Sequence, residues 1–227
     1  MWHQRSIKVL IAGWVFIGLM VNGHTAQGLT AQPQTGLSAE TVKKIGVLPF
    51  IKGKCSMTAA ENLDCPVGQF AHNPENIAPD SDNIITNYVQ EILQKRMGDK
   101  VIPLTKAMNA YMQMPKNEFT ETPRTLAQKL GQVLGADLMV AGIVSRYKKR
   151  IGGPAAISEP ASVAFAVYLI NVAGGRMLWS ASFSETQRSL SENILDARAF
   201  FKKGAKWLTA DELARYGVNK IFEKFPF

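Results

Sequence analysis

The order of hydrophobic and polar residues predicts four main strands, and a brief fifth one described below. A short apolar run over residues 45–50 suits a buried strand, and Pro49 should end its pairing. A longer apolar run over residues 137–147 predicts a second buried strand. Residues 161–172 and 176–187 carry apolar side chains at alternate positions on either side of a glycine turn. We therefore expect these last two strands to pair as an antiparallel hairpin with one face half exposed.

Apolar residues also recur at helical spacing in several stretches between and after these strands. The first stretch covers residues 82–97, where Asp80 or Ser81 can cap the start of a helix and Gly98 can end it. A brief strand over residues 100–104 should follow.

Two short helices are expected next. One begins at Thr105 and stops at Pro115, and we expect its methionines, Met112 among them, to fill gaps in the core. The other begins at Thr122-Pro123, with a cap followed by proline at the first helical position, and ends at Gly135. Its expected buried stripe consists of Leu126, Ala127, Leu130, Val133 and Leu134.

The C-terminal region should be helical, because capping-box spacing occurs twice, at Ser189 with Glu192 and at Thr209 with Glu212. A buried stripe follows the second box at Ala214, Val218, Ile221, Phe222 and Phe225. Together the elements predict an α/β fold, with a mixed β-sheet flanked by helices, an antiparallel C-terminal hairpin and terminal helices.

The first residues have the pattern of an export signal, with Arg5 and Lys8 in a basic start and an uncharged, mostly apolar run over residues 9–21. As a helix this run spans about 20 Å, which is short of the roughly 30 Å hydrocarbon core of a bilayer. We therefore expect cleavage rather than a permanent anchor. The predicted organisation is a cleaved signal peptide over 1–28, a flexible leader over 29–40 and a single α/β domain over 41–227.

We therefore expect the mature protein to work outside the cytoplasm. No cysteine lies near the expected cleavage sites, and amino-terminal lipidation needs a cysteine as the first mature residue. We expect a soluble protein without a stable membrane span after cleavage, associated with the outer membrane through a partner if at all. If the signal is retained, residues 9–21 become a tether instead.

The formal net charge is +8, and loss of Arg5 and Lys8 with the signal lowers it by 2, to +6. Nucleic acid is not an expected partner outside the cytoplasm, so this excess favours either solubility or an anionic envelope component. Arg146, Lys148, Lys149 and Arg150 concentrate positive charge at the end of an expected strand. They are candidate contacts for an anionic partner, the alternative being a solvated strand end.

Cys55 and Cys65 are the two cysteines of the chain. In an oxidising compartment an isolated pair indicates one disulfide, and the spacing is not that of a CxxC redox or zinc motif. Closing so short a loop should contribute roughly 2 to 3 kcal/mol. We therefore predict a structural disulfide rather than a catalytic thiol.

The catalytic options are few, because His72 is the one histidine that lies beyond the signal region. Walker A, GxGxxG and GxSxG motifs are absent from the sequence, and we predict no catalytic residue, no metal and no cofactor. Asp64, Asp80 and Asp82 cluster loosely in the sequence, so a two-carboxylate hydrolase of envelope glycans stays open as an alternative. The prediction is that the protein is not an enzyme.

Three segments carry a family resemblance. These segments are Ile45-Gly46-Val47-Leu48-Pro49-Phe50, residues 134–144 (LGADLMVAGIV) and residues 166–180 (AVYLINVAGGRMLWS). In order and spacing they resemble the TolB amino-terminal and CsgG-like group of bacterial envelope proteins. The resemblance implies a mixed sheet flanked by helices, in proteins that assemble or bind other envelope components and usually catalyse nothing. This chain differs from lipidated members because it lacks the amino-terminal cysteine.

The leading hypothesis is a periplasmic interaction or assembly protein whose partner is an envelope protein or a peptidoglycan-associated component. Besides the glycan hydrolase, a second alternative is an oligomeric secretion or outer-membrane assembly component, which predicts homo-oligomers. The chain shows no long alternating hairpin suited to crossing a membrane, so a channel role is not expected.

Overall fold

The computed structural model describes residues 41–55, 58, 61–70, 76–152, 157–187 and 207–227. The signal, the leader, His72 and the Ser189–Glu192 capping box lie outside the described residues. The strands are β1 (Ile45–Val47), β2 (Ile51–Lys52), β3 (Leu138–Lys148), β4 (Ile151–Gly152), β5 (Ile157–Glu159), β6 (Ser162–Asn171) and β7 (Met177–Thr186). The α-helices are α1 (Ser81–Met97), α2 (Leu104–Gln113), α3 (Pro123–Leu134) and α5 (Ala210–Phe222).

The main sheet is mixed, in the order β1-β3-β6-β7, and β2 also pairs with β3. β1 and β2 run parallel to β3, whereas β6 is antiparallel to both β3 and β7. This confirms the predicted mixed sheet and the predicted hairpin. The apolar run 45–50 does end its regular pairing before Pro49, and the chain resumes pairing with β3 at Ile51.

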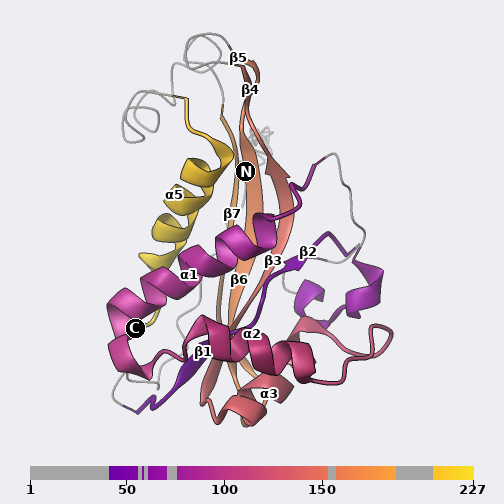
Figure 1. Ribbon diagram of the computed structural model, residues 1–227, viewed down its shortest axis with the longest axis vertical. Helices are drawn as coiled ribbons and strands as arrows, with labels where there is room; N and C mark the ends of the chain where they lie inside the picture. The colour runs from indigo at the N-terminus through magenta and orange to yellow at the C-terminus, as the bar shows by residue number, and fades with distance from the viewer. Residues whose placement is uncertain (1–40, 56–57, 59–60, 71–75, 153–156, 188–206) are drawn as a thin grey trace, which may run out of the picture.

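Helices cover both faces of this sheet. α1 and α5 pack side by side on one face, and α2 and α3 pack on the other (Figure 1). The β4–β5 hairpin lies at the end of the sheet away from α2 and α3 (Figure 1). Strand alternation divides the core in two, because neighbouring side chains point to opposite faces. On β3, Leu138, Val140 and Val144 face α1 and α5, and Met139, Ala141 and Ile143 face the other layer.

The helix starts and ends follow local chemistry in most places. Thr122 and Thr209 each form a complete capping box, and the left-handed backbone of Gly135 ends α3 as expected. The start of α1 differs from the prediction. Asp80 occupies the cap position without a side-chain cap bond, and the Ser81 hydroxyl donates to the Ala78 carbonyl oxygen at 2.7 Å.

Three further expectations are wrong. Residues 100–104 are not a strand, because Pro103 leads directly into α2 and pairing is limited to a bridge between Ile45 and Val101. Met112 is 73% exposed and Val133 is 65% exposed, so neither belongs to the core. Both side chains lie on helix faces that no described element covers, which helical spacing alone does not reveal.

A disulfide joins Cys55 and Cys65, as predicted. Both half-cystines are buried, and they pack in the same hydrophobic cluster as Leu63, Leu126 and Leu130. The bridge therefore closes the loop after β2, and its sulfur atoms pack against the layer formed by α2 and α3.

Replacing both cysteines by serine should lower the free energy of unfolding by roughly 2 to 3 kcal/mol, because the unfolded chain regains the entropy of an open loop. Urea denaturation of the oxidised wild type and the double variant measures this difference. A reducing agent should destabilise the wild type and leave the variant unchanged. Equal midpoints for the oxidised wild type and the variant would contradict a stabilising role.

Among the described helices, none combines the length and the apolar character that crossing a membrane requires.

Candidate functional site

A β-bulge near the end of β3 decides where the basic side chains point. Val144 pairs with Phe165 and Arg146 pairs with Ala164, so Ser145 is the extra residue on β3. Val144 and Tyr147 both lie in the core beside α1 and α5. Without the bulge, residues 146 and 148 would share the face of Val144. The inserted residue reverses the alternation and turns Arg146 and Lys148 to the opposite face.

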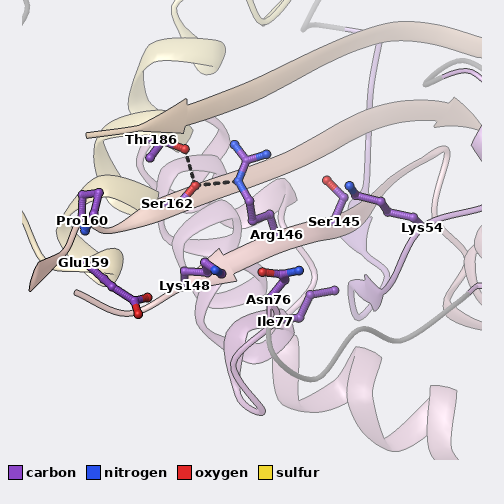
Figure 2. A pocket seen from close by; sticks show the side chains of 10 residues that line it. All are labelled: Lys54, Asn76, Ile77, Ser145, Arg146, Lys148, Glu159, Pro160, Ser162 and Thr186. Carbon is purple, nitrogen blue, oxygen red and sulfur yellow. Dashed lines mark hydrogen bonds between the residues drawn. The ribbon is translucent and has the colours of Figure 1, made fainter. Parts of the chain in front are cut away.

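On that face lies a cavity of about 450 Å³. Its lining comes from β3, from the segment that leads into α1, from the residue before Cys55 and from the facing ends of β6 and β7. The lining residues are Lys54, Asn76, Ile77, Ser145, Arg146, Lys148, Glu159, Pro160, Ser162 and Thr186. Figure 2 shows Lys54 and Ser145 at one end, Glu159 and Pro160 at the other, and Arg146 and Lys148 between them.

Local backbone pairing builds the wall beside the bulge. The amide of Tyr147 donates to the Asn76 carbonyl oxygen at 2.6 Å, and the amide of Ala78 donates to the Tyr147 carbonyl oxygen at 2.9 Å. Ile77 forms a parallel bridge with Tyr147. These backbone hydrogen bonds hold Asn76 and Ile77 against the end of β3. Their positions in the lining are therefore fixed by strand-like pairing.

The guanidinium of Arg146 is oriented by hydroxyl groups. Its Nε donates to Ser162 Oγ at 2.6 Å, and its Nη2 donates to Ser184 Oγ at 3.0 Å. Ser162 Oγ and Thr186 Oγ1 are themselves 2.5 Å apart (Figure 2). Ser162 is 3% exposed, so its hydroxyl group has a fixed position in the sheet and holds the Arg146 guanidinium in place.

The cavity has an uncompensated positive charge. Within the described part of the chain, Lys54, Arg146 and Lys148 make no ion pair with an acidic side chain. Glu159 is exposed and is the one acid among the described residues of the lining. Three cations against one acid in a concave site give a positive potential that favours an anionic group.

The predicted basic cluster is divided by the structure. Arg146 and Lys148 line the cavity, whereas Lys149 is exposed and outside its lining. Arg150 instead donates from Nη1 to the Trp207 carbonyl oxygen at 2.6 Å, which joins the end of β3 to the segment that leads into α5.

Sequence reasoning missed Lys54, Asn76, Ser162 and Thr186 as parts of a site. The one available signal was the run of serines at alternate positions on β7, which marks a polar outer face but not its neighbours.

The acidic residues considered in the sequence lie elsewhere. Both oxygens of Asp64 accept from Arg124, at 2.5 and 2.8 Å, and this hydrogen bonding raises the pKa of Arg124. Asp82 lies 3.3 Å from Lys52 Nζ. No group of three metal-ligating side chains occurs among the described residues. The structure therefore brings no second carboxylate to Glu159 in the cavity.

Among the comparisons with known proteins, matches were found with solved structures alone. No protein-family model matches the chain, and no curated protein matches it. Among solved structures, a PelC dodecamer from Paraburkholderia phytofirmans is 13% identical, with 85% of this chain and 92% of that chain covered and a TM-score of 0.47.

Two further solved structures are similar. Lipoprotein GNA1162 from Neisseria meningitidis is 18% identical, with 71% of this chain and 96% of that chain covered and a TM-score of 0.40. The LpoB C-terminal domain from Salmonella enterica is 14% identical, with 65% and 85% covered and a TM-score of 0.37. Similarity of this extent assigns neither a family nor a function, and the resemblance to the TolB amino-terminal and CsgG-like group stays a prediction.

Proposed function

We propose that this chain is an exported, non-enzymatic interaction or assembly protein of the bacterial cell envelope, which binds an anionic group of its partner in the cavity beside Arg146. The partner is an envelope protein or a peptidoglycan-associated component. The observation that carries the proposal is the convergence of Lys54, Arg146 and Lys148 in one concave site, with no ion pair to an acid among the residues that the structure describes.

The chemistry of the lining supports binding rather than catalysis. Ser145, Ser162 and Thr186 are its hydroxyl groups, and none has a histidine or carboxylate as a hydrogen-bond partner within the described residues. A hydroxyl nucleophile needs an adjacent base, and a glycosidase needs a second carboxylate across the bond that it breaks. The lining supplies cations and hydrogen-bond donors, which position an anion without reacting with it.

Exposed apolar side chains are compatible with a role in assembly. Phe119 is 87% exposed in the loop between α2 and α3, and Met112 and Val133 on these helices are also exposed. Contact with a protein partner or with a second copy of the chain would cover such side chains.

Replacing Arg146 and Lys148 by alanine should reduce capture of the partner by about tenfold or more, because each side chain contributes a charge-assisted hydrogen bond. The measurement is quantitative pull-down from cross-linked cell envelope. Lys149→Ala is the matched control, since it removes the same charge from the same segment outside the cavity. Failure to capture any specific protein or glycan with the wild type, or equal capture by the double variant, would refute the proposal.

A further inference from the structure

The polar face of the sheet extends beyond the cavity along β7. Trp179, Ala181 and Phe183 point toward the core beside α5, so the residues that alternate with them point to the other face. These outward residues all carry hydroxyl groups: Ser180, Ser182, Ser184 and Thr186. Ser182, Ser184 and Thr186 are exposed, and their positions repeat at about 7 Å along the strand.

The neighbouring strand β6 places small residues beside the exposed part of this row, whereas buried Tyr168 lies opposite Ser180. Ala164 lies opposite Ser184 and Ala166 lies opposite Ser182 in the β6–β7 register. Short side chains leave the row shallow and accessible to an extended ligand. The row leads directly into the cavity, because Ser184 and Thr186 belong to the network that orients Arg146.

Arg146 keeps donors available at the point where the row meets the cavity. Its bonds to Ser162 and Ser184 use Nε and one hydrogen of Nη2, which leaves Nη1 and the other Nη2 hydrogen. A guanidinium offers paired donors that match the two oxygens of a carboxylate. Lys148 and Lys54 add point charges in the same cavity.

We propose that this face binds an acidic glycan, with the carboxylate of one sugar held by Arg146 and Lys148 and the neighbouring sugars hydrogen-bonded along the hydroxyl row of β7. The inference rests on the proposed function, for which it names the class of ligand. Hydroxyl groups both donate and accept, so the row suits the many hydroxyls of a sugar chain. At the far end of the cavity, the exposed carboxylate of Glu159 accepts a hydrogen bond from a sugar hydroxyl.

A lipid surface fits this face less well. A phosphate headgroup satisfies the same cations, but stable attachment to a bilayer also needs apolar side chains that enter it. Of the four large apolar side chains exposed on the described surface, Met112, Phe119 and Val133 lie on or between α2 and α3. Ile151 alone lies at the end of the sheet that carries the cavity, and a single side chain does not make an anchor.

The test is calorimetric titration of the mature protein with a short oligogalacturonate, with a neutral oligosaccharide of the same length as the control ligand. We expect saturable binding of the uronate that weakens as salt rises, and no binding of the neutral chain. Arg146→Ala and Lys148→Ala should each weaken binding by about tenfold or more. Arg146→Lys should restore part of the affinity, because it keeps the charge without the paired donors. Lys149→Ala should leave the affinity within about twofold.

Thermal unfolding of each variant establishes that it is folded before titration. The absence of uronate binding at low salt, or an equal loss with Lys149→Ala, would overturn the proposal. Arg146-dependent binding to vesicles that contain an anionic phospholipid, without binding of the uronate, would also overturn it and replace the glycan with a lipid phosphate. If the envelope pull-down still recovers a partner that depends on Arg146, the proposed function survives and the glycan assignment alone fails.

Discussion

Gly142→Val should lower the free energy of unfolding by about 3 to 5 kcal/mol, even though valine favours strands. Gly142 lies in the middle of β3, and a Cβ atom there would stand 2.0 Å from a ring carbon of Phe50. Phe50 is 4% exposed, and its amide donates to Thr86 Oγ1 of α1 at 3.1 Å, which ties that part of the chain in place. The Phe50 ring must therefore leave its site and lose most of its own packing contacts.

A double-mutant cycle measures this conflict directly. Phe50→Ala alone should cost about 3 to 5 kcal/mol through the cavity that it leaves. Adding Gly142→Val to that background should cost little, because the added methyl groups occupy the vacated space. Gly174→Ala is the matched control, since a Cβ atom there meets nothing within 4 Å. Additive losses in urea denaturation would show that Phe50 is not the obstacle.

The fold should lose stability steeply above pH 10, and Tyr147 and Tyr168 are the cause. Burial is the first cause that raises the pKa of Tyr147. The second is the carboxylate of Asp211, which accepts a hydrogen bond from the Tyr147 hydroxyl at 2.5 Å. Burial raises the pKa of Tyr168 to about 12. Below pH 10 both tyrosines are protonated whether the chain is folded or unfolded. Above pH 10 the unfolded chain releases protons that the folded chain retains, so the free energy of unfolding falls as the pH rises.

The expected loss approaches about 1.4 kcal/mol per pH unit for each tyrosine, until the pH passes the folded pKa, or about 5 kcal/mol in total near pH 12. Urea denaturation at a series of pH values measures it. Tyr147→Phe should cost about 1 kcal/mol at neutral pH and should flatten the alkaline slope, and Tyr147→Phe with Tyr168→Phe should flatten it further. Lysine deprotonation acts equally in all variants, so an unchanged slope would rule out the tyrosines.

The helices and strands that could be predicted are those whose ends and buried faces depend on residues close together in the sequence. α3 is an example, because the Thr122 cap, the proline after it and Gly135 all act within a turn of the helix ends. The β6–β7 hairpin is another, because alternation and a glycine turn define it locally. Val133 was misassigned because its place on a helix face says nothing about which face another element covers.

The candidate site could be predicted in part. Arg146 and Lys148 were identified from a local excess of charge, but their separation from Arg150 depends on a bond to the distant Trp207 carbonyl. Lys54 had no signal, because it reaches the cavity through the parallel pairing of β2 with β3. Parallel pairing joins segments far apart in the chain, and no short pattern reveals its register.

The sequence by itself determined the longer strands and the helices of the described residues, the hairpin and the pair of cysteines that forms the disulfide, because each depends on residues close together in the chain. The tertiary structure decided which basic side chains share a cavity. The bulge at Ser145 turns Arg146 and Lys148 away from α1 and α5, and the hydroxyls of β6 and β7 then orient Arg146. A one-residue change of register reverses the face of every side chain after it, and long-range packing rather than local pattern selects that register.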